Sequence, residues 1–261
     1  MLGIKIKCRN NVVLNLFQHL LTDSLFLKFQ NCHTELVQCD NFIRKKGFTL
    51  AEVLLVLTII GIIASLTIPN LITTTQNSAT VASVRKAYSS FSQAYSSFVA
   101  DDTKMESIFV AGTGTPVIAL SYFATKLNLI KNCGTGTGCF SDTVYTSLNN
   151  IPVDNINENT VLAKGILADG TFIGISAILA GGCQTILGTG PLVNTCGTIV
   201  IDINGYKKPN KFGRDLFTFW ITKTGIFPCG TNNDIYVDDC DDSDVGVSCA
   251  NKILLDGAVN Y

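Results

Sequence analysis

Histidine and charged side chains are scarce in this chain. It has two histidines in 261 residues, and charged residues make up 15% of it. His19 and His33 both lie near the N-terminus, so residues 34–261 have no imidazole for a Ser/His or Cys/His catalytic pair. The glycine-rich segments have neither a Walker nor a dinucleotide-binding context. We therefore expect a protein that is not an enzyme, although a catalytic pair of carboxylates stays open.

The few charges are unevenly distributed. Residues 1–47 hold 7 Lys and Arg against 3 Asp and Glu, whereas residues 48–261 hold 12 against 17. By the positive-inside rule, a basic part before an apolar segment places the N-terminus in the cytoplasm and the acidic part across the membrane. Neither part has the basic patch of a nucleic-acid-binding protein, so no nucleic acid is expected as a partner.

An apolar run from Val53 to Ile68 indicates a membrane-spanning helix. Its 16 residues are short for a helix that crosses about 30 Å of hydrocarbon, and residues 48–51 complete the span. Glu52 then lies inside the span, where a carboxylate costs about 2.5–3.5 kcal/mol. No Ala-x-Ala site follows the run, so it is not a secretory signal peptide and would stay in the mature protein.

Such a carboxylate needs a partner, and a free amino group is one candidate. A cut between Gly47 and Phe48 would give Phe48 a cationic N-terminus one helical turn from Glu52. In a packed helical filament, the carboxylate of one chain could then neutralise the N-terminus of its neighbour. A plain signal anchor with a chance glutamate is the alternative.

The run from Lys45 to Ala64 resembles the prepilin signature of type IV pilins and type II secretion pseudopilins. In that family a basic leader ends in glycine, phenylalanine follows the cut, and glutamate is the fifth residue of the mature chain. Gly47, Phe48 and Glu52 match these positions, and Pro69 matches a later proline of the helix. The resemblance covers about residues 45–98.

The resemblance implies how the chain is processed and where it acts. A membrane aspartyl peptidase would cut after Gly47 and N-methylate Phe48. The helix would anchor the mature protein in the bacterial inner membrane as a single pass, with its head in the periplasm, before it reaches a filament or the cell surface. Its other partners would be an assembly platform and further pilin or pseudopilin subunits. The implied segments are a leader (1–47), a transmembrane and filament-core helix (48–69), the soluble half of the helix (70–100) and a globular head (101–261).

The leader departs from the family in its length. Leaders of this family are usually much shorter than residues 1–47. We therefore expect the start to be assigned too far upstream, although a later start would need an alternative initiation codon, because Met105 is the next methionine after Met1.

Three functions fit these features. The preferred one is a structural subunit of a type IV pilus or a type II secretion pseudopilus, polymerised through its apolar helix. The second is a minor tip pilin or adhesin that binds a surface, DNA or a secreted substrate, and nucleic acid is a partner only in such a DNA-uptake role. The third is a monomeric, membrane-anchored domain that forms no filament.

The apolar periodicity predicts one long helix from Phe48 to about Val99. Pro69 removes one backbone donor, so a kink is expected there. Asp101, Asp102 and a Gly/Thr loop at 111–116 mark the end of the helix. In its second half, apolar residues recur at three- and four-residue steps and form one stripe, made of Val81, Val84, Ala87, Tyr88, Phe91, Ala94, Tyr95 and Phe98.

The rest of the chain predicts a small antiparallel sheet. A short helix at 121–129 and a disulfide-pinned loop at 133–139 come first. Asp169-Gly170 between two β-rich runs predicts a tight hairpin. The fold class is therefore α+β and pilin-like, with the sheet packed on the distal half of the helix. The predicted strands are Thr160–Ala168, Thr171–Leu179, Thr198–Ile203 and Leu216–Thr222.

Ten cysteines predict a disulfide framework in an exported domain. Three of them, Cys8, Cys32 and Cys39, lie in the leader. The other seven are an odd number, so one thiol is unpaired or pairs between subunits. Zinc is the alternative, but there is no Cys-x-x-Cys motif and no histidine nearby. The seven form close groups, which are Cys133 with Cys139, Cys183 with Cys196, and Cys229 with Cys240 and Cys249.

Two acidic segments are candidate calcium sites, and no other cofactor is predicted. The segment from Asp202 to Phe217 resembles a motif of the same prepilin-type branch, and some pseudopilins carry calcium in their C-terminal loops. A hydrogen-bonded turn between two strands, with Arg214 pairing an acid, is the alternative. The loop 234–244 lacks the full EF-hand spacing, so exposed, solvated acid is its alternative. The candidate ligands are Asp202, Asn204, Asn210 and Asp215 in the first segment, and Asp238, Asp239, Asp241, Asp242 and Asp244 in the second.

Overall fold

The computed structural model describes residues 47–110, 115–153, 155–177 and 182–261, without the side chain of Asn70. All of the predicted leader except Gly47 lies outside the described residues. By its internal contacts the chain divides into two units, Met1–Val56 and Leu57–Tyr261. The head domain described below belongs to the second unit.

The first described element is a single long helix, α2 (Leu50–Ala100), of 51 residues. The helix ends at Ala100, which confirms the prediction that it ends at about Val99. The helix continues through Pro69 without a break, and a kink there stays a prediction. The threonines beyond the proline keep their hydroxyl groups satisfied, because Oγ1 of Thr73 and Thr75 donate to main-chain oxygens four residues earlier, at 3.0 and 2.8 Å.

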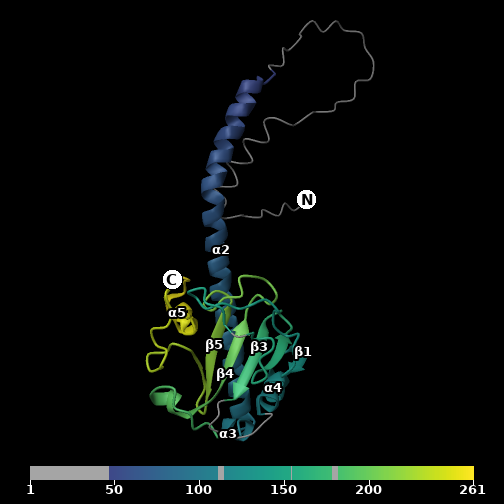
Figure 1. The fold of residues 1–261 in the computed structure, drawn as a ribbon, viewed down its shortest axis with the longest axis vertical. Coiled ribbons are helices and arrows are strands. Elements are labelled where there is room, and N and C mark those ends of the chain that lie inside the picture. The colour runs from purple at the N-terminus through teal and green to yellow at the C-terminus, as the bar shows by residue number, and fades with distance from the viewer. Residues whose placement is uncertain (1–46, 111–114, 154, 178–181) are drawn as a thin grey trace, which may run out of the picture. The chain divides into compact units, whose positions relative to one another are not determined.

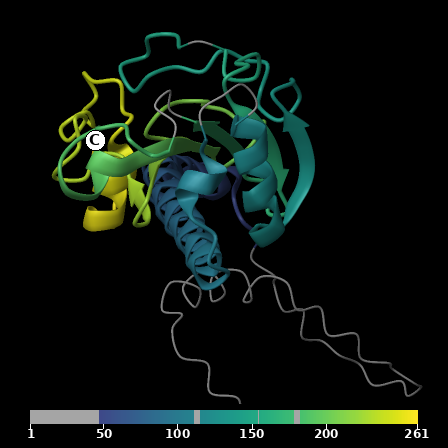
Figure 2. The same ribbon diagram turned by 90° about the horizontal axis from the view of Figure 1, so that it is seen from below.

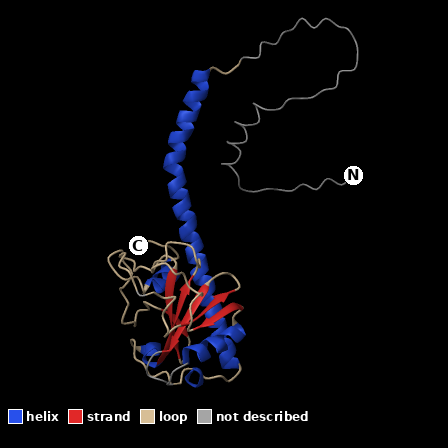
Figure 3. Ribbon diagram, turned by 45° about the vertical axis from the view of Figure 1, so that its right-hand side comes forward, coloured by secondary structure: helices blue, strands red, loops and turns tan. Residues whose placement is uncertain are grey.

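The head contains three further α-helices among the described residues and one antiparallel sheet, shown in Figure 1 and, by type of element, in Figure 3. The strands are hydrogen-bonded in the order β1-β2-β3-β4-β5-β6, so each strand pairs with its neighbour in sequence. The elements are α3 (Met105–Ile108), α4 (Thr115–Lys126), β1 (Leu129–Gly134), β2 (Ala163–Leu167), β3 (Phe172–Ala177), the 3-10 helix η1 (Gly190–Asn194), β4 (Thr195–Asp202), β5 (Leu216–Thr222), β6 (Ile226–Pro228) and α5 (Cys249–Asp256).

All four predicted strands are present, and β5 has the predicted bounds. β1 and β6 are additional, and β4 begins three residues before the predicted Thr198. The prediction of a helix at 121–129 is wrong at both ends. α4 begins at Thr115, because Pro116 falls in its first turn, where a missing N–H costs no hydrogen bond. Leu129 begins β1 instead of ending a helix, and β1 also takes the first residues of the predicted 133–139 loop.

The apolar stripe of α2 packs on one face of the sheet. Tyr88 stacks on Phe219 of β5 at 6.0 Å between ring centroids, and Phe91 meets the same ring edge-on at 5.7 Å. α4 contributes to the same core, and Figure 2 shows both helices on one side of the curved sheet. The predicted stripe is confirmed, since Val81, Val84, Ala87, Phe91, Ala94 and Phe98 are buried and Tyr88 and Tyr95 are half-buried.

The opposite face of the sheet is covered by loops. Phe140 and Tyr145, from the segment between β1 and β2, pack on Phe172 and Leu216. Phe140 meets Phe172 edge-on at 5.8 Å. Because both faces are covered, all seven residues of β5 are buried, as expected for a strand that reads as a nearly continuous apolar run.

The predicted hairpin between β2 and β3 is confirmed. Gly170 has a φ of 87°, which side-chain-bearing residues rarely adopt, and the Asp169 carboxylate accepts the Thr171 N–H at 3.0 Å. Lys86 of α2 lies 2.7 Å from the same carboxylate. The hairpin is therefore tied to the C-terminal half of α2.

Candidate processing and assembly site

The segment that carries the predicted cut precedes α2. Gly47, Phe48 and Thr49 have no regular secondary structure, and the helix begins at Leu50. Phe48 is 79% exposed. The Gly47–Phe48 bond thus lies in an open, non-helical stretch of three residues, the form in which a peptidase can bind a chain.

Thr49 and Glu52 cap the N-terminus of α2 through three hydrogen bonds that run in both directions between them. The Thr49 N–H and hydroxyl both donate to Glu52 Oε2 at 2.9 Å. In return, the Glu52 N–H donates to Thr49 Oγ1 at 3.2 Å. This is a capping box, which satisfies backbone donors that have no partner inside the helix. Glu52 therefore already has one role within its own chain.

The helix that follows exposes the apolar side chains of its first half. From Leu50 to Ile72 its large apolar side chains are about half exposed or more, and the first buried one is Val81. Among the described residues, α2 is the one helix long and apolar enough to cross a membrane. An exposed apolar surface of this length is stable only in lipid or against another apolar surface.

Residues 43–68 match the family model described as the prokaryotic N-terminal methylation motif. The chain carries the signature of type IV pilins and pseudopilins. The match includes Gly47, Phe48 and Glu52, stops just before Pro69 and leaves the head unmatched. No curated protein and no solved structure matches the chain significantly. The head itself has the geometry of a helix packed on an antiparallel sheet.

That geometry agrees with the predicted class. A long N-terminal apolar helix is followed by a six-stranded antiparallel sheet, and three disulfides lie in the head. The predicted close pairs are confirmed as Cys133–Cys139 and Cys183–Cys196. In the remaining group, Cys240 pairs with Cys249.

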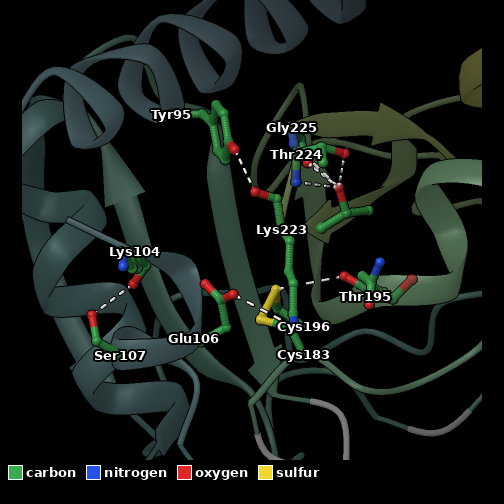
Figure 4. The surroundings of a disulfide bond; sticks show 12 residues. Tyr95, Lys104, Glu106, Ser107, Cys183, Thr195, Cys196, Lys223, Thr224 and Gly225 are labelled. Carbon is green, nitrogen blue, oxygen red and sulfur yellow. Dashed lines mark hydrogen bonds and ion pairs between the residues drawn. A yellow bond between two sulfur atoms is a disulfide. The ribbon is translucent and has the colours of Figure 1, made fainter. Parts of the chain in front are cut away.

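The Cys183–Cys196 bond lies where the C-terminal part of α2 is held to the sheet, as Figure 4 shows. The Tyr95 hydroxyl of α2 donates to the main-chain oxygen of Lys223 at 2.6 Å. The Lys223 ammonium lies 3.5 Å from Glu106. Burial, and then the charge of Glu106, raise the pKa of Tyr95, so this hydroxyl stays a donor at neutral pH.

Cys229 is the unpaired thiol that the odd count predicts. It is fully buried beside Leu192 and Trp220. Burial raises the pKa of the Cys229 thiol, and the nearby Asp234 carboxylate raises it further. A disulfide between subunits, the other prediction for the odd thiol, is not available to a side chain with no exposed surface.

The segment between β4 and β5 is a turn built around two buried aspartates. Asp202 accepts the N–H groups of Asn204 and Gly205 at 3.1 and 2.9 Å and the hydroxyl of Tyr145 at 2.7 Å. Asp215 accepts the N–H groups of Asn210 and Lys211 at 2.6 and 2.5 Å and the Asn204 amide at 3.2 Å. Arg214 lies 3.9 Å from Asp242. These contacts match the alternative to a calcium site, which was a hydrogen-bonded turn with Arg214 paired to an acid.

Both carboxylates are hard to ionise in this turn. Burial raises the pKa of Asp202 to about 7, against the lowering effect of the Tyr145 hydrogen bond, and the charge of Asp215 adds to the rise. Burial likewise raises the pKa of Asp215. The same surroundings raise the pKa of Tyr145, chiefly through burial and then through the charge of Asp202.

The predicted calcium ligands are dispersed or already occupied. In the described ranges, no three or more His, Cys, Asp or Glu side chains lie close enough to hold a metal ion. In the loop 234–244, Asp239 accepts the N–H groups of Val245 and Val247 at 2.9 and 3.2 Å, while Asp238, Asp241 and Asp242 are exposed and Asp244 is half-buried. Calcium stays a prediction without geometric support.

Two functional contacts were not predicted. Thr49 caps the helix, and the Thr-x-x-Glu spacing before an apolar run is a sequence signal that could have identified it. Tyr145 binds Asp202 across 57 residues of sequence, and no local pattern indicates this pair.

Proposed function

We propose that the chain is a prepilin-like structural subunit of a type IV pilus or a type II secretion pseudopilus. The bond between Gly47 and Phe48 is cut, Phe48 is N-methylated, and the subunit enters a filament through its apolar helix. The proposal rests on the methylation motif at residues 43–68, followed directly by an exposed apolar helix. Its partners are a prepilin peptidase, an assembly platform and other subunits in the inner membrane.

Gly47 allows processing to be separated from folding. Among the described residues, a Cβ atom built on Gly47 meets no atom within 4 Å, so a larger side chain at this position leaves the described part of the chain undisturbed. A peptidase that grips the bond, in contrast, must accommodate that side chain. Gly61 provides a control, because a Cβ there also meets nothing within 4 Å.

The test is N-terminal mass spectrometry of the membrane-fraction protein, made together with a prepilin peptidase. We expect the wild-type chain to begin at methylated Phe48. Gly47→Val should remain uncut, and Gly61→Val should be cut normally. An uncut wild-type bond would refute the proposal and favour the monomeric, membrane-anchored domain. Low abundance in purified filaments would instead favour a minor tip subunit.

In the filament, Glu52 has a second role in this proposal. Both Thr49 donors reach Oε2, and among the described residues no hydrogen bond reaches Oε1. Oε1 can therefore face the cationic N-terminus of a neighbouring Phe48 while Oε2 still caps the helix. The pairing offsets the roughly 2.5–3.5 kcal/mol that an unpaired carboxylate costs inside the apolar layer.

Three variants separate pairing from capping. Glu52→Val removes the charge and the cap, whereas Glu52→Gln removes the charge and keeps an acceptor for Thr49, as glutamine does in other capping boxes. Thr49→Val weakens the cap and keeps the charge. We expect all three to be processed, both Glu52 variants to be poorly incorporated into filaments, and Thr49→Val to be incorporated normally. Normal incorporation of Glu52→Gln would show that the charge has no part in assembly.

A further inference from the structure

A cleft of about 540 Å³ lies between α2 and the turn that joins β4 to β5. Its helix side runs from Thr73 to Ser83, and its other side includes Lys207, Lys208 and Pro209. The C-terminal segment closes one end, where Val259 accepts a hydrogen bond from Asn77 at 3.4 Å. In Figure 1 the C-terminus lies beside α2 at this level. All of these residues belong to the unit Leu57–Tyr261.

The cleft begins where the apolar surface of α2 ends. Ile72 is the last exposed large apolar side chain of the first half of the helix, and Thr73 is the first residue of the cleft. From Leu50 to Ile72 the helix rises about 34 Å at about 1.5 Å per residue, against about 30 Å of hydrocarbon. When this segment spans a bilayer, Thr73 and the residues after it lie at the level of the lipid headgroups.

The cleft is positively charged. Three cationic side chains line it, and no carboxylate does. Arg214 is engaged by the main-chain oxygen of Tyr261 at 2.5 Å and lies near Asp242. Lys207 and Lys208 are exposed, and no ion pair involves them within the described part of the chain. These two lysines are thus available to an anion.

The two exposed lysines favour a phosphate as the ligand. Phosphatidylglycerol carries a negative charge on its phosphate, and an anionic lipid surface attracts lysines that lie near it. Asn204 also lines this wall, but its side-chain oxygen is buried and is therefore not offered to a ligand.

We propose that this cleft binds the headgroup of an anionic phospholipid, with Lys207 and Lys208 on the phosphate, and so holds the head at the membrane surface before assembly. The proposal rests on membrane insertion of α2, as in the proposed function, but requires neither cleavage nor polymerisation. Near an anionic surface, each lysine contributes about fivefold to binding, so the pair contributes about 30-fold at low salt.

The test is native mass spectrometry of the full, uncut chain purified in a nonionic detergent and titrated with phosphatidylglycerol, phosphatidylcholine or inorganic phosphate. We expect phosphatidylglycerol to bind in preference to phosphatidylcholine. The double variant Lys207→Gln/Lys208→Gln should lose this preference and bind phosphatidylglycerol no more tightly than phosphatidylcholine. The control Lys104→Gln/Lys131→Gln makes the same charge change at exposed positions that do not line the cleft, and should bind as the wild type does.

Three results would overturn the lipid site. These are an unchanged affinity of the cleft variant, an equal loss in the control variant, and displacement of the lipid by inorganic phosphate at the same concentration, which would indicate a site for small anions. Because the uncut chain is used, absence of lipid binding leaves the proposed function standing. Conversely, an uncut Gly47–Phe48 bond in cells would contradict the proposed function and leave the lipid site intact.

Discussion

The buried Asp202 predicts an unusual pH dependence of stability. Its pKa rises from 3.8 to about 7 on folding, chiefly through burial. The folded state therefore holds a proton more tightly than the unfolded state. The stabilisation is complete below about pH 4 and is lost as the pH rises through about 7, opposite in sign to the usual salt-bridged aspartate.

The size of the effect follows from the same two pKa values. Between about pH 5 and about pH 8, the free energy of unfolding should fall by about 2.5 kcal/mol, at up to about 1.4 kcal/mol per pH unit. Asp215, whose pKa is also raised by burial, adds a contribution of the same sign. Asp202 has no exposed surface, so solvent does not screen it.

Urea unfolding of the full chain in a nonionic detergent measures this difference. Trp220 is the single tryptophan of the chain and is buried in β5, so its fluorescence reports on the head. Asp202→Asn keeps an oxygen for the Asn204 and Gly205 N–H groups and should remove most of the fall between the two pH values.

Asp169→Asn is the matched control. Burial raises the pKa of Asp169, but hydrogen bonds from Lys86 and Thr171 outweigh it and lower the pKa overall. Its contribution is lost at acid pH, so this variant should keep the fall between about pH 5 and about pH 8. An Asp202→Asn variant with the pH dependence of the wild type would refute the reasoning.

Three further predictions concern the head. Phe91→Ala removes a fully buried ring from its contact with Phe219, so it should lower the free energy of unfolding by about 3–5 kcal/mol in the same urea assay. A loss under about 1 kcal/mol would contradict the packing of α2 on β5. Cys229 should resist iodoacetamide in the folded chain and react after unfolding, because burial raises the pKa of its thiol. Peptide mapping measures this, and alkylation of Cys229 in the folded chain would show that the thiol is accessible. Added calcium should leave the urea midpoint unchanged, because the oxygens of Asp202, Asp215 and Asp239 already accept backbone N–H groups. If calcium shifts the midpoint and Asp239→Asn abolishes that shift, the predicted calcium site would be supported instead.

Local sequence patterns were sufficient wherever the contact partners lie within one helical turn or one strand. The spacing of Val84, Ala87 and Phe91 identifies the buried stripe of α2 because residues three and four apart share a face of a helix. The Asp169-Gly170 hairpin is predictable because its geometry depends on two residues. Both signals survive folding because the tertiary structure uses the same faces and turns.

Patterns that depend on distant partners gave wrong or open predictions. The start of α4 at Thr115 was missed because the preceding glycines and threonines favour a loop, although Pro116 in the first turn is a helix-start signal. Close spacing could not decide which of Cys229, Cys240 and Cys249 is free, because that depends on which side chains the fold buries. Acidic residues suggested calcium, and tertiary contacts instead supply Asp202 with the hydroxyl of Tyr145.

The sequence by itself identified the N-terminal signal. The basic residues, Gly47, Phe48, Glu52 and the apolar run are contiguous, so they form the methylation motif without any contribution from the head. The tertiary structure decided the rest. It brings Lys207 and Lys208 beside residues 73–83 of α2, and it buries Asp202 in contact with the hydroxyl of Tyr145. Both arrangements join residues more than fifty positions apart, and such proximity arises only when the helix and the loops pack on the two faces of the sheet.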